Sequence, residues 1–185
     1  MSIAELEKMI TNYCTNAGVS IIYSPIDTGS YDDYSDTITL PATNKNDYTI
    51  ILHELAHTTG KSNRLARSCY LDRANRSSYA IEELVAEFTM LLILKFFNVE
   101  YNLVDSLDYI CAWQSEIKYQ NFNISEAHNQ AIQAMEYILE HNTPKKDLKP
   151  PVEAIKTEKP TESVEPVSEV SEDEEFKNWL VSKIF

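Results

Sequence analysis

The sequence has few of the features that mark secreted, membrane-spanning or disulfide-stabilised proteins. It holds only 3 glycines and 3 cysteines in 185 residues, and no two cysteines form a CxxC pair. An odd number of scattered cysteines does not suit a disulfide framework, so we expect a reducing environment. The longest apolar run, Phe88 to Leu94, is far too short to span a bilayer. The N-terminus carries acidic residues where a signal peptide is basic and apolar, which favours a cytoplasmic protein.

Positive charge is also scarce. Lys and Arg number 16 against 29 Asp and Glu, which gives a formal net charge of −13. Residues 1–142 alone hold 9 basic and 19 acidic residues, so the acidity belongs to the body of the chain. Such a surface repels the phosphate backbone, and we do not expect direct nucleic-acid binding. Basic residues concentrate between Lys61 and Arg76, a segment that we interpret as a solvated loop, with contact to an acidic partner as the alternative.

The composition divides the chain into three parts. Residues 1–142 are rich in aromatic and aliphatic side chains and are expected to form one folded domain. Residues 143–175 consist largely of Pro, Glu, Lys, Ser, Thr and Val, and we expect a disordered linker because they cannot bury enough apolar surface to fold. Residues 176–185 form a short amphipathic segment, which would either recruit a protein partner or pack as a helix on its own domain.

Hydrophobic periodicity predicts a mostly helical body with two short strands. Asp47 is a suitable N-cap for a helix that ends at Thr59, with Gly60 just beyond it. A polar, turn-rich connection is expected between the strands. The remaining helices are predicted over residues 3–16, 77–97, 105–119 and 125–140, and the strands over residues 19–23 and 37–40.

The strongest chemical signal is the HExxH motif His53-Glu54-Leu55-Ala56-His57. Residues four apart on a helix lie on the same face, so both imidazoles can reach one zinc ion. The glutamate next to the first histidine can then reach a water molecule on that ion. The motif lies in an apolar helical segment, which makes two unrelated surface histidines a poorer explanation. It therefore predicts one zinc ion per chain.

The third zinc ligand is expected from the next helix. Position 63 is Asn, so the longer HExxHxxGxxH motif is not complete. Glu83 and Glu87 are four residues apart and share a helix face, and we interpret Glu83 as the third ligand. Glu87 would accept the free N–H of a ligating histidine. Glu82 is rotated by one residue, and we expect it to be exposed at the start of the helix, although the sequence alone leaves all three acids open as ligands.

This ligand set predicts metal-assisted hydrolysis of a protein or peptide substrate. Glu54 would act as the general base that deprotonates water and later returns the proton to the leaving amine. A hydrogen-bond donor for the developing oxyanion is also required. Tyr79, one turn before Glu83, and His128 are the candidates by elimination.

Five segments carry a family resemblance: YDDYSDTITLP, DYTIILHELAHTTGKSNRLAR, SYAIEELVAEF, SLDYICAWQSEI and AIQAMEYIL. In this order they resemble the zincin-like metallopeptidase domain of ArdC-type antirestriction proteins and of polyvalent proteins of phages and conjugative elements, over roughly residues 20–140. The resemblance implies an α+β zincin fold, a zinc site at His53, Glu54 and His57 completed by the EELVAE segment, and protection of incoming DNA from host defence. ArdC-type proteins also carry an N-terminal single-stranded-DNA-binding domain, whereas this sequence begins directly with the peptidase-like part. DNA binding is therefore not expected here.

Three functions are compatible with these observations. The first is a zinc metalloendopeptidase with an antirestriction role that acts on a cytoplasmic protein. The second is a non-catalytic interaction protein that uses the zincin fold as a scaffold and its C-terminal tail to recruit a partner. The third is an ImmA-like peptidase that cleaves a repressor. The presence of Glu54 favours chemistry over a scaffold, because a structural zinc ion has no use for that carboxylate.

Overall fold

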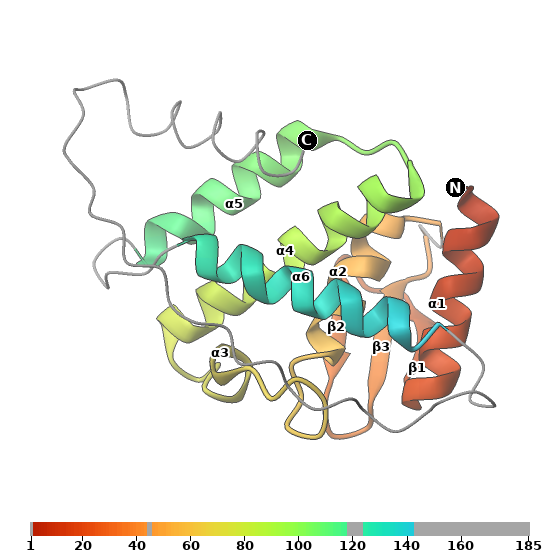
Figure 1. Ribbon diagram of the computed structural model, residues 1–185, viewed down its shortest axis with the longest axis horizontal. Coiled ribbons are helices and arrows are strands. Elements are labelled where there is room, and N and C mark those ends of the chain that lie inside the picture. The colour runs from red at the N-terminus through yellow and green to blue at the C-terminus, as the bar shows by residue number, and fades with distance from the viewer. Residues whose placement is uncertain (1, 44–45, 118–123, 143–185) are drawn as a thin grey trace. The chain divides into compact units, whose positions relative to one another are not determined.

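Six helices and three short strands follow one another in the computed structural model, which describes residues 2–43, 46–117 and 124–142 (Figure 1). The expected linker over residues 143–175 and the amphipathic segment over residues 176–185 lie outside the described residues. Across the described ranges, no helix is both long and apolar enough to cross a membrane. The elements are α1 (Ile3–Ala17), β1 (Ser20–Ser24), β2 (Ser30–Asp32), β3 (Thr37–Pro41), α2 (Tyr48–Thr58), α3 (Ser68–Leu71), α4 (Arg76–Phe97), α5 (Leu103–Ile117) and α6 (Ile124–Glu140).

The helix boundaries follow the capping residues. Ser2 and Glu5 form a capping box at the start of α1, and Gly18 closes the helix in the left-handed conformation with φ 73°. The Asp47 side chain accepts hydrogen bonds from the first turn of α2, as the sequence predicts. Gly60, which follows α2, has another role: a Cβ atom there would lie 2.5 Å from Cγ of Tyr70. The glycine therefore allows the loop to pack on that ring.

The sheet has the strand order β1-β3-β2. β1 runs parallel to β3, and β2 runs antiparallel to β3 at the other edge. The two strands expected from the sequence are confirmed. β2 was not expected, because its three residues lie inside the polar connection that we interpreted as turns. The alternating residues Ile38 and Leu40 of β3 are buried, and they fix which face of the sheet meets the helices.

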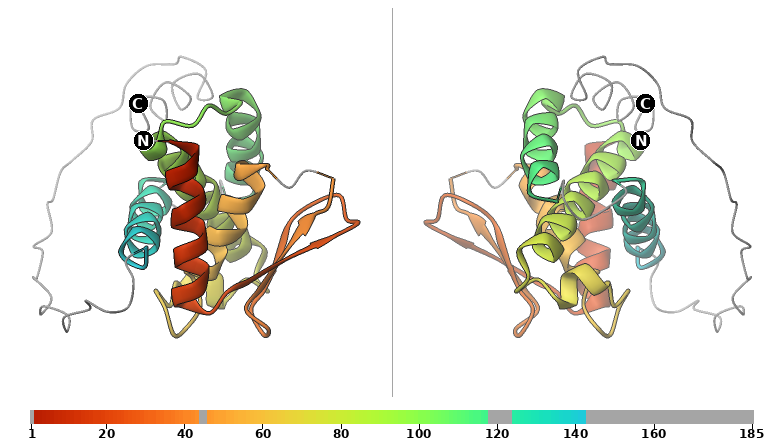
Figure 2. Two further views of the ribbon diagram at one scale, coloured as in Figure 1. Left: turned by 90° about the vertical axis from the view of Figure 1, so that its right-hand side faces the viewer. Right: turned by 90° about the vertical axis from the view of Figure 1, so that its left-hand side faces the viewer.

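Helix α4 lies at the centre of the helical layer and packs against α2, α5 and α6. Figure 2 shows the sheet on one side of the helices, next to α2. Leu52 and Leu55 of α2 and Leu84 and Leu91 of α4 are fully buried between these elements. The protein is mostly helical with a small sheet, as predicted. This arrangement places α2 between the sheet and α4, so that one face of α2 meets the first turns of α4.

The basic segment after α2 is only in part the solvated loop that we expected: Arg76 is exposed, whereas two other arginines point into the fold. Arg67 is buried, and the guanidinium of Arg64 donates hydrogen bonds to the carbonyl oxygens of Thr58 (2.7 Å) and Ala17 (3.1 Å). Arg64 also forms an ion pair with Asp36 at 2.8 Å. Arg64 and Arg67 therefore satisfy carbonyl groups near helix ends inside the fold, a role that charge counting does not reveal.

Candidate metal centre

Helix α2 directs the two motif histidines into one cleft. Their rings lie edge to face, with the centroids 5.0 Å apart, because residues four apart share a helix face. The cleft has a volume of about 780 Å³ and lies between α2, the β2 edge of the sheet, and helices α4 and α5. His53, Glu54, His57, Tyr79, Glu83, Glu87 and Tyr109 all line it.

Glu83 of α4 completes a set of three metal donors. One carboxylate oxygen of Glu83 lies 3.3 Å from Nε2 of His53, and the other lies 3.6 Å from Nε2 of His57. One donor atom from each residue lies within 4.8 Å of the others. Two imidazole nitrogens and one carboxylate oxygen are a ligand set of catalytic zinc sites, which keep a further position open. The chemistry of the donors therefore fits a divalent metal ion.

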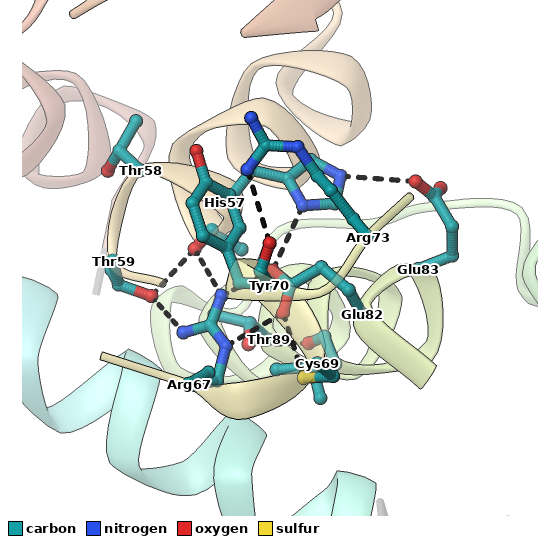
Figure 3. Close-up of polar contacts among 12 residues, drawn as sticks. His57, Thr58, Thr59, Arg67, Cys69, Tyr70, Arg73, Glu82, Glu83 and Thr89 are labelled. Atoms are coloured by element: carbon teal, nitrogen blue, oxygen red, sulfur yellow. Dashed lines mark hydrogen bonds and ion pairs between the residues drawn. The ribbon is translucent and has the colours of Figure 1, made fainter. Parts of the chain in front are cut away.

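Two more carboxylates of α4 contact the outer nitrogens of the histidines. Glu87 lies 3.1 Å from Nδ1 of His53, as expected for an acceptor of its free N–H. Glu82 lies 3.1 Å from Nδ1 of His57 (Figure 3). The expectation that Glu82 is exposed at the helix start is wrong, since only 2% of it is accessible. Both histidines thus present Nε2 towards Glu83 and hold a carboxylate on the opposite side.

The electrostatics of the site keep Glu82 and Glu83 ionised. Burial raises the pKa of Glu83, but contacts with His53 and His57 outweigh it and lower that pKa to about 2. The pKa of Glu82 is likewise lowered to about 2, because Arg67 and His57 outweigh the effect of burial. Burial lowers the pKa of His53, but Glu83 and Glu87 raise it to about 10. A carboxylate must be deprotonated to bind a metal, and Glu83 meets that condition.

Glu54 also lines the cleft but is not one of the three donors. Its side chain is 8% exposed, and burial raises its pKa, with the two motif histidines opposing the shift. The chain passes close above it at Gly29, where a Cβ atom would lie 2.9 Å from Cγ of Glu54 and 2.6 Å from Cγ2 of Ile50. A raised pKa brings a carboxyl group closer to the range in which it can both accept and return a proton.

Tyr109 of α5 belongs to the site but was not predicted from the sequence as a site residue. Its hydroxyl donates a hydrogen bond of 2.5 Å to Glu83, and its ring lies edge to face with His53, centroid to centroid 5.7 Å. Periodicity predicts a helix over residues 105–119, but no local pattern places this tyrosine in the site. Tyr79 lines the cleft as well, and its ring contacts Trp113 at 5.3 Å. His128 does not line the cleft: it lies on α6, and its ring packs against Phe88 at 5.9 Å.

A two-histidine, one-carboxylate centre on adjacent helices beside a small sheet defines a zincin-like protein. The chain belongs to the MPTase-PolyVal family of zincin-like metallopeptidases, whose family model matches residues 7–130. A comparison with curated proteins gives no match.

Two solved structures of the antirestriction protein ArdC from plasmid R388 are similar to this chain. The Mn(II)-bound structure is 25% identical with a TM-score of 0.56, and the similarity covers 72% of this chain and 51% of that one. The metal-free structure is 26% identical with a TM-score of 0.54, covering 72% and 50% respectively. The chain therefore matches about half the length of ArdC. Family and neighbours agree with the fold and family expected from the sequence.

Proposed function

We propose that this chain is a zinc-dependent metallopeptidase that cleaves a protein or peptide in the cytoplasm. His53, His57 and Glu83 would hold one zinc ion per chain. The proposal rests chiefly on Glu54, whose buried carboxylate lines the same cleft as the three ligands. The Mn(II)-bound ArdC structure supports a divalent metal in this fold. Zinc is the metal of choice because two imidazoles and a carboxylate are typical of its catalytic sites.

The chain's own residues carry the proton transfers of peptide hydrolysis. When bound, the metal supplies a Lewis acid that acidifies water and polarises a carbonyl group. Glu54 takes one proton from the attacking water as the water oxygen forms a bond with the carbonyl carbon. The C–N bond then breaks, and Glu54 returns the proton to the leaving amine. The burial that raises the pKa of Glu54 favours the second half of this cycle.

Two tyrosines are suited to stabilise the carbonyl oxygen as it gains negative charge. Burial and the charge of Glu83 raise the pKa of Tyr79 to about 12, so its hydroxyl keeps its proton near neutral pH. The same two causes raise the pKa of Tyr109 further. Both residues line the cleft, and Tyr79 can donate its hydroxyl proton to the oxygen. Tyr109 has a single O–H, which it donates to Glu83, so it orients this ligand and could serve the oxygen only by giving up that bond.

The cleft suits an extended peptide. β2 is an edge strand that pairs with β3 in the described sheet, and its residues Ser30 and Tyr31 line the cleft together with Gly29. An edge strand can hydrogen-bond a further extended segment through its free backbone groups. A peptide that binds along β2 would pass directly over Glu54, because Gly29 packs against that residue.

We further infer an anti-defence role for a phage or conjugative element. Support comes from the family, and from the structural neighbour, an antirestriction protein of a plasmid. The chain matches about half of ArdC, and the proposal concerns the metallopeptidase activity of this matched part. The acidic composition argues against direct binding of nucleic acid by the chain.

Metal analysis and a cleavage assay test the proposal in two steps. The chain is purified without chelators, and zinc is measured by elemental analysis. Cleavage of a peptide library by wild type is then compared with that by Glu54→Gln, which keeps the shape of the side chain but cannot take up a proton. We expect one zinc ion in both proteins, and activity lower by about 10²- to 10⁴-fold in the variant.

The two failures have different meanings. Wild type without zinc would contradict the metal centre itself. Zinc without any cleavage, or with equal cleavage by Glu54→Gln, would favour the alternative in which the zincin fold is a non-catalytic scaffold and the segment 176–185 recruits a partner.

A further inference from the structure

A buried arginine lies behind the metal centre and has no place in the ligand set described so far. Arg67 precedes α3, and its guanidinium holds Glu82 with two hydrogen bonds, from Nε to Oε2 (2.9 Å) and from Nη2 to Oε1 (2.5 Å). The same guanidinium is fixed to the C-terminal end of α2 through Thr59 Oγ1 (2.5 Å) and the carbonyl oxygen of Ala56 (3.1 Å). The ion pair is thus attached to the helix that carries both histidines.

Glu82 links this arginine to His57. Its Oε1 atom, which accepts from Arg67, also lies 3.1 Å from Nδ1 of His57. Its Oε2 atom also accepts a hydrogen bond from the thiol of Cys69 at 3.2 Å. Burial and Glu82 raise the pKa of Cys69 to about 12, so the thiol stays protonated as a donor near neutral pH. Figure 3 shows the continuous series Arg67, Glu82, His57 and Glu83.

A bidentate arginine is well suited to fix a carboxylate that must orient a histidine. A lone buried carboxylate can rotate or take up a proton, whereas two parallel N–H···O bonds fix its plane and its charge. The carboxylate then requires an N–H from the Nδ1 side of His57, which leaves Nε2 as the lone-pair donor facing Glu83.

The cleft also holds more negative charge than a divalent metal ion could neutralise. Four carboxylates, Glu54, Glu82, Glu83 and Glu87, line one cleft with the two histidines. A divalent ion would neutralise only two of these negative charges. Within the ranges that the structure describes, Arg67 is the lysine or arginine that forms an ion pair with one of these four. Arg73, which also lines the cleft, pairs with Asp33 instead.

We propose that Arg67 is a positioning residue of the metal centre, which acts through Glu82 to hold His57 with its proton on Nδ1 and Nε2 directed at the metal. The inference rests on the proposed metal site and adds a residue outside it. The alternative is that the Arg67–Glu82 ion pair only stabilises the fold. The two hypotheses make different predictions for metal binding, because a purely structural ion pair would leave the metal affinity of the folded chain unchanged.

Arg64 provides a matched control. It lies in the same segment, and its side chain is 4% exposed, against 3% for Arg67. It also donates to a carbonyl oxygen at the end of α2 and pairs with a carboxylate, Asp36. Asp36, however, contacts Tyr31 and Lys61 and no metal-site histidine. Arg64→Lys and Asp36→Asn therefore make the same chemical changes as Arg67→Lys and Glu82→Gln at a site away from the centre.

The first experiment measures the affinity for zinc by competition with a chromogenic chelator, in wild type and these four variants. Circular dichroism before each titration shows that each variant is folded. We expect Arg67→Lys and Glu82→Gln to weaken zinc binding by about 10- to 100-fold, and both control variants to match wild type. Equal affinity in folded Arg67→Lys and wild type would overturn the inference and leave the metal site intact. No zinc binding by wild type would overturn both.

The second experiment needs no variant and covers the case in which the buried substitutions prevent folding. Long-range ¹H–¹⁵N correlation spectra of the zinc-loaded wild type report the state of each histidine nitrogen. We expect His57 to show a protonated Nδ1 that exchanges slowly with solvent and an Nε2 atom that binds the metal. Metal binding through Nδ1 of His57, or an Nδ1 proton in rapid exchange, would contradict the role of Glu82 and Arg67.

Discussion

The two halves of helix α4 are equally buried but differ in chemistry. The second half, from Phe88 to Phe97, buries Met90, Leu91, Ile93 and Leu94 against its neighbours, an ordinary apolar core. The first half buries apolar residues such as Leu84 as well, but it also buries three carboxylates. Glu82, Glu83 and Glu87 are only 2%, 5% and 6% exposed. Burial of apolar surface stabilises a fold, whereas burial of a carboxylate costs free energy unless a partner is present.

The partners of these carboxylates come from elsewhere in the chain. Glu83 and Glu87 contact the motif histidines of α2, and Tyr109 of α5 adds a hydrogen bond to Glu83. Glu82 contacts His57 and also pairs with Arg67, from the segment before α3. Apolar packing thus specifies the second half of the helix, whereas the first half depends in addition on these polar contacts. The predictions below separate the two contributions.

The largest change in stability is expected in the apolar half. Leu91 is fully buried, and Leu91→Ala should lower the free energy of unfolding by about 2–5 kcal/mol, because it removes buried methyl groups and leaves a cavity. Chemical denaturation followed by circular dichroism measures this. The half-buried Leu92 on the same helix provides the control, with a smaller loss in Leu92→Ala. Because Leu91 belongs to the apolar half and not to the metal site, we expect folded Leu91→Ala to bind zinc as wild type does.

The second-largest effect is the stabilisation of the folded chain by bound zinc, which depends on the acidic half of α4. Zinc at a free concentration of 100 times its dissociation constant should raise the free energy of unfolding by about 2.7 kcal/mol, since it binds only the folded chain. Glu83→Gln removes a ligand and should abolish this increase while leaving the metal-free chain folded. Thermal unfolding with and without zinc measures the difference. The same increase in Glu83→Gln as in wild type would exclude Glu83 as a ligand.

Local sequence patterns predicted part of each half. The apolar periodicity predicted the extent of α4, and the HExxH spacing together with Glu83 and Glu87 identified groups that meet in the cleft. These patterns depend on helix geometry alone, where neighbours three or four residues apart share a face.

What the sequence did not reveal depends on contacts between distant segments. Glu82 has the same local setting as an exposed acid at a helix start, and only the approach of Arg67 from a preceding loop explains its burial. Tyr109 reaches Glu83 from another helix. β2 is too short and too polar to be recognised, because its pairing with β3 and not its composition makes it a strand.

A smaller effect is expected for the acceptor behind His53. Glu87→Gln keeps the size of the side chain but weakens the acceptor for Nδ1 of His53, so zinc affinity should fall by about 10- to 100-fold, or about 1.4–2.7 kcal/mol. Chelator competition measures it, and Glu100→Gln at an exposed position just beyond α4 is the control. A loss as complete as in Glu83→Gln would mean that Glu87 is itself a ligand.

The smallest effect is expected for a charge cluster outside α4, which provides the baseline for an ordinary ion pair. Burial raises the pKa of Asp36, but hydrogen bonds from Lys61 and Tyr31 and the charge of Arg64 outweigh it and hold the pKa below its usual range. A group whose pKa is depressed on folding stabilises the folded state above its unfolded pKa, and that contribution disappears as the pH falls through the folded pKa.

Asp36→Asn should therefore lower the free energy of unfolding by up to about 1 kcal/mol near neutral pH, since the side chain is partly exposed to solvent. The difference between variant and wild type should shrink below about pH 4, where Asp36 begins to take up a proton in the unfolded chain. Urea denaturation of both proteins at several pH values measures it, and zinc affinity should not change. A difference that grows as the pH falls would contradict the sign of this linkage. A loss of zinc affinity would show instead that this cluster also supports the metal centre, so that the acidic half of α4 would no longer be the only region specified by chemistry.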